Sequence, residues 1–155
     1  MIVYRDALPC EGTFGSYEIS SSMEIAVAHL GFIVNMKGRV NYTTKTTMEI
    51  ADQSKLVNKL GKFKVLVEIL PFLAEQTIQN IENKGCKVTL RPENKNRSDN
   101  GNIVIDSDFG LIDNVQDIQT KVKMIPGVVE VGIFHGMTWK TIVGKNSGVE
   151  EINYK

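Results

Sequence analysis

The sequence is poor in the features that would place a protein outside the soluble globular class. Among its 155 residues are two cysteines, four prolines and one tryptophan, and its eighteen basic side chains balance its eighteen acidic ones. Without a basic excess, the chain is not expected to bind nucleic acid, and without a long apolar run it is not expected to enter a membrane. The composition favours one domain, or two small domains that share a surface.

Cysteine usage and the start of the chain bear on the compartment. Cys10 and Cys86 lie far apart in the sequence, and neither has a second cysteine or a pair of histidines beside it. A disulfide between them remains open, but two thiols in a reducing compartment are favoured. The first six residues lack the basic head and apolar stretch of a signal peptide. We therefore expect a cytoplasmic protein.

Between residues 64 and 134, apolar side chains recur first at strand spacing and then at helical spacing, twice over. Strands are predicted at residues 65–69, 86–90, 103–105 and 129–133. The first helix is expected to hold Pro71 in its first turn and to stop at Gly85. The second is expected to be capped by Asp113 or Asn114 and to break at Pro126. The predicted inward stripes are Leu70, Ala74, Ile78 and Ile81 in the first helix, and Val115, Ile118, Val122 and Ile125 in the second.

The order of these elements is strand–helix–strand–strand–helix–strand. It predicts a ferredoxin-like split βαβ unit, in which four antiparallel strands carry two helices on one face. Residues 140–143 predict a further strand outside this unit, and we expect it to pair with an N-terminal segment. The unit would then be a small domain inserted into a sheet that the chain leaves and later rejoins.

Three segments carry a resemblance to a known family. They are residues 50–70, which begin Ile-Ala-Asp-Gln-Ser-Lys, residues 99–102, which read Asp-Asn-Gly-Asn, and residues 125–132, which read Ile-Pro-Gly-Val-Val-Glu-Val-Gly. In this order and spacing they resemble the C-terminal half of type A ribose-5-phosphate isomerase, from Ile50 to Ile152. The resemblance implies an α/β (α+β) fold: a partial Rossmann-like parallel sheet from residues 1–63, a ferredoxin-like domain at 64–134, and a return to the first sheet at 135–155.

The resemblance also implies an activity. Members of the family interconvert ribose 5-phosphate and ribulose 5-phosphate in the pentose phosphate pathway, through an enediolate and without a metal or organic cofactor. The reaction needs a base, donors for the developing oxyanion and a cationic site for the phosphate. The family's Ala-Asp-x-Ser-Lys motif occurs here at residues 51–55, so the resemblance assigns Lys55 to substrate binding. Asp52 is expected to cap the turn that follows. A homo-oligomer, a dimer or a tetramer, is also expected.

Other elements of the family's site are less complete in this sequence. Residues 12–16 are similar to its phosphate loop, with Thr13 and Ser16 as candidate donors to phosphate and a plain turn as the alternative. The family's Asp-Gly-Ala-Asp-Glu and Gly-Gly-Gly segments do not occur. Glu24 and Glu49 are the nearest carboxylates on either side and are the candidates for the base, although Glu24 can equally lie on the outer face of a helix.

Three functions are compatible with these patterns. The first is an aldose–ketose isomerase that acts on ribose 5-phosphate. The second is a catalytically silent relative whose ferredoxin-like unit serves as an oligomerisation or binding module. The third is an unrelated regulatory domain of the same topology, which would leave the motifs at residues 51–55 and 100–102 unexplained.

Overall fold

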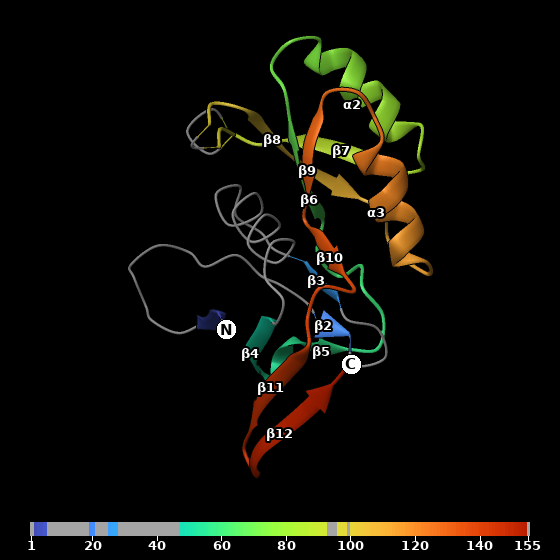
Figure 1. Ribbon diagram of the computed structural model, residues 1–155. Coiled ribbons are helices and arrows are strands. Elements are labelled where there is room, and N and C mark those ends of the chain that lie inside the picture. Colours follow the sequence, from blue (N-terminus) through green and yellow to red (C-terminus); the bar gives the residue numbers. More distant parts are fainter. Residues whose placement is uncertain are drawn as a thin grey trace.

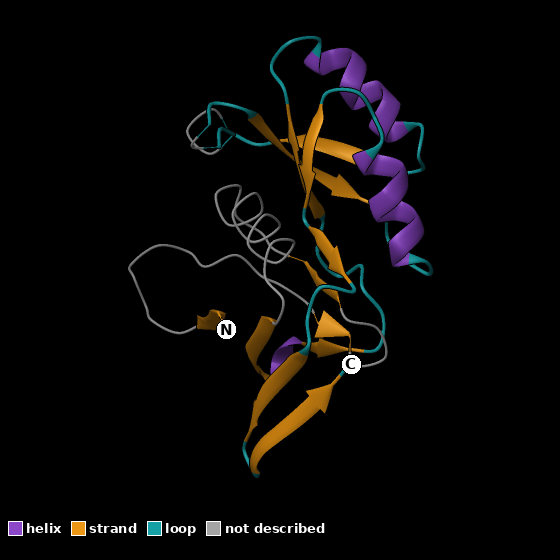
Figure 2. Cartoon of the chain, in the orientation of Figure 1, coloured by secondary structure: helices purple, strands orange, loops and turns teal. Residues whose placement is uncertain are grey.

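The computed structural model describes residues 2–5, 19–20, 25–27, 47–92, 96–98 and 100–154, which form three four-stranded sheets and two α-helices (Figures 1 and 2). No helix within these ranges is long and apolar enough to cross a membrane. The helices are α2 (Ala74–Glu82) and α3 (Val115–Lys123), and η1 (Gln53–Lys55) is a single 3₁₀ turn. The strands are β1 (Ile2–Arg5), β2 (Ile19–Ser20), β3 (Ile25–Val27), β4 (Thr47–Asp52), β5 (Leu56–Val57), β6 (Val65–Ile69), β7 (Lys87–Leu90), β8 (Ile103–Asp108), β9 (Val128–Val131), β10 (Ile133–His135), β11 (Lys140–Lys145) and β12 (Gly148–Asn153).

One sheet has the strand order β7-β8-β6-β9 and is antiparallel throughout. Both α2 and α3 cover the same face of this sheet, as Figure 1 shows. Because the first and third strands of the unit lie in the middle and its second and fourth at the edges, this is the split βαβ arrangement. The prediction of a ferredoxin-like unit within an α+β fold is confirmed.

Burial on both faces explains the nearly continuous apolar sequence of β6. Val65, Val67 and Ile69 belong to the core beneath the helices, which also contains Ile81 of α2 and Val122 of α3. Each of these five side chains is at most 1% exposed. Burying an aliphatic side chain of this size contributes roughly 1.5–3 kcal/mol, so this layer is the main source of stability for the sheet.

The other face of β6 carries a buried carboxylate. Glu68 is fully buried and accepts hydrogen bonds from the Ser98 hydroxyl at 2.7 Å and the Asn102 side-chain amide at 2.8 Å. The backbone N–H of Asn102 donates in turn to Ser98 Oγ at 3.2 Å. These bonds offset the cost of burying Glu68 and hold the connection between β7 and β8 against the sheet.

A second sheet has the order β1-β4-β11-β12 and contains three parallel strands. β4 lies between β1 and β11 and is parallel to both, while β12 runs antiparallel to β11. The chain leaves this sheet after β4, forms the helix-covered sheet, and returns as β11. The prediction that residues 140–143 pair with an N-terminal segment is therefore confirmed. The domain boundaries at 63/64 and 134/135 stay predictions.

The third sheet, β10-β3-β2-β5, corrects one predicted strand. Residues 129–133 were expected to form one strand, but β9 ends at Val131, and Ile133 begins β10, which pairs with β3. The chain bends at Gly132, whose N–H still donates to the carbonyl of Leu66 at 2.7 Å. The alternation of apolar residues suggested one strand because Val131 and Ile133 are both buried, although they belong to different sheets.

The start of the first helix also differs from the prediction. α2 begins at Ala74, so placing Pro71 in its first turn was wrong. Leu73 precedes the helix with a left-handed backbone (φ 56°, ψ 37°), which interrupts the helix pattern, and Leu70 is 45% exposed instead of facing the core. Of the two residues predicted to cap α3, Asn114 is the one that does so: its side-chain oxygen accepts a hydrogen bond from the Asp117 N–H at 3.0 Å.

Of the two cysteines, the described part of the chain includes only Cys86, which is a free thiol just before β7. Burial, and then the nearby Glu82 carboxylate, raise the pKa of this thiol to about 11. Cys86 therefore carries its proton at neutral pH and packs as a small apolar side chain against the core. Cys10 lies outside the described residues.

Candidate functional site

The parallel sheet brings the ends of two strands together at one edge. β4 ends at Asp52 and β11 ends at Lys145, and in the register of this pair Gly144 lies opposite Asp52. Because the two strands are parallel, both carboxyl ends reach the same edge of the sheet. Ligands of open α/β sheets bind outside the carboxyl ends of the strands, so this edge is the candidate site.

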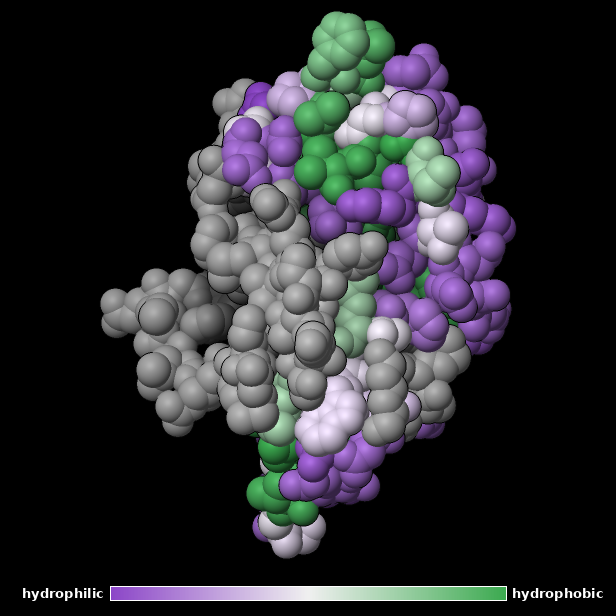
Figure 3. Space-filling model, in the orientation of Figure 1, coloured by the Kyte–Doolittle hydropathy of each residue, from purple (hydrophilic) through white to green (hydrophobic). Residues whose placement is uncertain are grey.

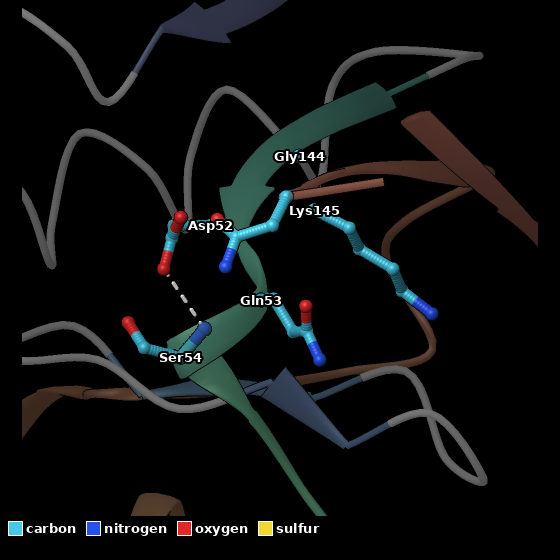
Figure 4. A pocket seen from close by; sticks show the side chains of 6 residues that line it. Asp52, Gln53, Ser54, Gly144 and Lys145 are labelled. Atoms are coloured by element: carbon cyan, nitrogen blue, oxygen red, sulfur yellow. Dashed lines mark hydrogen bonds between the residues drawn. The ribbon is translucent and has the colours of Figure 1, made fainter. Parts of the chain in front are cut away.

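An open concavity of about 430 Å³ lies at this edge (Figure 4). Its side chains offer two amides, a hydroxyl, a carboxylate and an ammonium group, a set that suits a hydrophilic ligand with hydroxyl groups and negative charge. Within the described part of the chain, no three His, Cys, Asp or Glu side chains gather closely enough to hold a metal ion. The lining residues are Asp52, Gln53, Ser54, Gly144, Lys145 and Asn146.

Asp52 ends the strand and begins the turn that follows it. Its backbone is extended (φ −81°, ψ 150°), and its Oδ1 accepts a hydrogen bond from the Ser54 N–H at 2.9 Å, drawn as a dashed line in Figure 4. This confirms the expected capping role. The same hydrogen bond, the Ser54 hydroxyl and the charge of Lys55 hold the pKa of the Asp52 carboxyl below its ordinary value. Asp52 therefore presents a carboxylate to the concavity at neutral pH.

Lys55 is the last residue of η1, one short turn beyond the end of β4. Its side chain is partly buried, and it is not one of the residues that line the concavity. The turn is closed by the N–H of Leu56, which donates to the carbonyl of Gln53. The strand and its capped turn thus fix where Lys55 lies relative to the sheet edge, while its role in substrate binding stays a prediction.

The candidate base Glu49 lies within β4, away from its end. Glu49 is 4% exposed and is buried beside Thr141, its register partner in β11, which is fully buried. It does not line the concavity, which begins three residues later at Asp52. The other candidates, Glu24, Thr13 and Ser16, lie outside the described residues.

Sequence reasoning missed the contribution of β11 to this edge. The sequence predicted a strand only at residues 140–143, whereas β11 continues to Lys145 and is followed by a tight connection to β12. Composition does not show that β11 lies parallel to β4, which brings Lys145 and Asn146 beside Asp52. One signal could have found them: a strand that rejoins a parallel sheet ends at the same edge as its parallel neighbour.

Comparison with known proteins bears on the identity of this chain. The model of the family described as ribose 5-phosphate isomerase A (phosphoriboisomerase A) matches residues 23–148, so the likeness begins ahead of Ile50. The ribose-5-phosphate isomerase A of Picrophilus torridus is 41% identical over 116 residues, which are 75% of this chain and 52% of the relative. The chain therefore spans about half the length of this relative.

Two solved structures are similar over most of the chain. The ribose 5-phosphate isomerase A of Methanocaldococcus jannaschii superposes with a TM-score of 0.81 at 31% identity, over 88% of this chain and 62% of that one. A D-ribose-5-phosphate isomerase in complex with phospho-erythronic acid gives a TM-score of 0.80 at 30% identity, with the same coverage of 88% and 62%. Together with the family match over residues 23–148, these likenesses show that the chain belongs to the ribose 5-phosphate isomerase A family.

Proposed function

We propose that the chain binds ribose 5-phosphate at the edge where β4 and β11 end, and that it interconverts this sugar with ribulose 5-phosphate through an enediolate. The observation that carries the proposal is the position of Lys55, one capped turn beyond the inner parallel strand and next to a polar concavity. A similar isomerase holds phospho-erythronic acid, which supports a sugar phosphate as the ligand. We place this activity in the cytoplasm and the pentose phosphate pathway, with no metal or organic cofactor.

The lysine and the carboxylate at this edge have complementary roles in such a reaction. The Lys55 ammonium stabilises negative charge, either on the phosphate or on the oxygen that becomes negative in the enediolate. The Asp52 carboxylate accepts a hydrogen bond from a sugar hydroxyl and so orients the sugar beside Lys55. Both groups come from one short segment, so their separation is set by the capped turn and not by a mobile connection.

The base that moves the proton between C2 and C1 is proposed to be Glu24 or Glu49, and Thr13 and Ser16 are proposed to donate to the phosphate. A base must come within hydrogen-bond reach of the proton that it removes. Glu49 is buried within β4, so it can act only if the sugar reaches the covered face of the sheet. Comparing Glu24→Gln with Glu49→Gln separates the two, because the loss of kcat should be confined to the variant that lacks the base.

Conversion of ribose 5-phosphate by the purified chain tests the proposal. Lys55→Ala should lower kcat/KM by about 10²–10³-fold, the usual effect of removing one donor to a developing oxyanion. Lys84→Ala is the matched control, because it removes an exposed lysine in the turn after α2. In D₂O, NMR should show deuterium at C1 of the product when the proton passes through a base. A folded chain that converts no sugar phosphate would contradict the proposal and favour a silent binding module.

We also propose that the chain forms a homo-oligomer, in which a second copy covers an apolar surface. Leu70, Phe72 and Leu73 are 45%, 80% and 63% exposed in the connection between β6 and α2. Figure 3 shows apolar atoms gathered at the end of the molecule where this connection lies. A two-fold contact would pair this patch with itself. Sedimentation should give a dimer or tetramer that Phe72→Ser weakens, and a monomer at all concentrations would contradict the proposal.

A further inference from the structure

Lys145 is a charged residue at the concavity that sequence motifs do not explain. It ends β11, and the neutral amides of Gln53 and Asn146 line the concavity with it. Figure 4 shows Asp52 and Ser54 at one side of the opening, while the side chain of Lys145 extends away from them, past Gln53. Lys145 thus places positive charge on the side of the opening away from the Asp52 carboxylate.

Lys145 forms an exposed ion pair with Glu150. Its ammonium lies 2.5 Å from a carboxylate oxygen of Glu150 on the neighbouring strand β12, and the two side chains are 31% and 45% exposed. Ion pairs exposed to this degree contribute little to stability, because water screens the charges and ordering two long side chains costs entropy. A ligand that offers more charge than one carboxylate can therefore displace Glu150 from Lys145.

The same hairpin contains a second pair that differs in this respect. Lys140 lies 2.6 Å from Glu151, is only 17% exposed, and its ammonium sits 5.1 Å from the centre of the Trp139 ring. It does not line the concavity. Lys140 is therefore held by two neighbours and takes no part in lining this concavity, which makes this pair the internal control for Lys145 and Glu150.

We infer that Lys145 is a specificity-determining residue, which leaves Glu150 and binds the anionic group of the sugar phosphate. A phosphate monoester carries about −1.5 to −2 charges at neutral pH, against −1 for the carboxylate, so its attraction for the ammonium is greater. Gln53 and Asn146 supply uncharged donors beside it. Glu150 then competes with the substrate, and its charge sets the affinity. This inference rests on the proposed function, because it deepens the description of the same site.

Two pairs of matched variants test the inference in the full chain. Lys145→Met keeps the aliphatic stem and removes the charge, and it should raise KM for ribose 5-phosphate about three- to tenfold with little change in kcat. Glu150→Gln should lower KM about twofold, because the competitor for Lys145 is gone. Lys140→Met and Glu151→Gln should leave KM unchanged. Added salt should raise the KM of the unmodified chain more steeply than that of Lys145→Met.

The outcomes separate this inference from the proposed function. If the chain is active and Lys145→Met and Glu150→Gln both leave KM unchanged, the inference is overturned while the isomerase activity stands. If the chain is inactive, calorimetric titration with phospho-erythronic acid decides. Binding that Lys145→Met weakens and Glu150→Gln strengthens supports the inference without catalysis, and binding that neither variant alters, or no binding at all, overturns it. Melting temperatures of all four variants identify any effect due to folding.

Discussion

Gly61→Ala should destabilise the fold strongly, because two segments touch backbone to backbone at Gly61. A Cβ on this residue would lie 2.1 Å from the carbonyl oxygen of Gly110 and 2.7 Å from the Cα of Leu111. The approach is fixed by a hydrogen bond of 2.9 Å from the Ile112 N–H to the Leu60 carbonyl, and both of these residues are buried. Ordinary carbon contacts need about 3.5–4 Å, so one backbone must move by about 1 Å or more.

The expected loss in the free energy of unfolding has two sources, an unfavourable backbone conformation and steric overlap. Gly61 has a φ of +130°, and a positive φ costs an alanine about 1–2 kcal/mol. Forcing the segments apart adds about 1–3 kcal/mol of the kind measured for overpacked cores, and weakens a hydrogen bond worth about 1 kcal/mol. We therefore expect the free energy of unfolding to fall by about 2–6 kcal/mol, a large part of the 5–15 kcal/mol of a typical domain.

Gly148 supplies a control with nearly the same φ. Its φ is +131°, and no described atom lies within 4 Å of the Cβ that an alanine would add. Gly148→Ala should therefore lose only the backbone cost of about 1–2 kcal/mol. Urea unfolding followed by circular dichroism measures both variants. Equal losses for the two would show that Gly61 does not approach Gly110 as closely as the structure describes.

Two further predictions concern ionisable side chains, Glu68, which is fully buried, and Cys86, which is partly buried. Glu68→Ala should lower the free energy of unfolding in urea by about 2–4 kcal/mol, because the Ser98 hydroxyl and the Asn102 amide lose their acceptor in a buried setting. Glu68→Gln, which keeps one acceptor oxygen, should lose less, and a larger loss would refute the role of the oxygen. The pKa of the Cys86 thiol is raised from 9.0 to about 11 in the fold, so the unfolded chain ionises first and stability should fall as pH rises from about 9 to about 11. Cys86→Ala should remove this component of the pH dependence, and an unchanged slope would contradict the assignment.

Local spacing was enough to predict the helix-covered sheet. Its strands and helices lie in one continuous stretch, and the apolar positions of each element face one core, so periodicity and burial agree. The predictions failed where periodicity continued across a break. Ile133 keeps the alternation of Val131 although the chain bends at Gly132, and Pro71 could have opened a helix had Leu73 not adopted a left-handed backbone.

Only one of the two segments that form the candidate site could be predicted from the sequence. The segment from Asp52 to Lys55 is contiguous, so its cap and its lysine could be predicted from residue types alone. Lys145 joins that segment only through the parallel pairing of β11 with β4, although β4 ends at Asp52 and β11 begins only at Lys140. The local sequence around Lys145 does not indicate which strand lies beside it.

The sequence by itself thus determined the order of the elements in the helix-covered sheet, the family and the capped turn that carries Lys55, since each depends on residues that lie close together in the chain. Tertiary structure alone decided which strand lies beside β4, which charge faces the opening there, and where Gly61 must meet Gly110. These contacts join residues far apart in the chain, and no local preference encodes them. They form because the inserted unit folds and returns the chain to the sheet edge that it left.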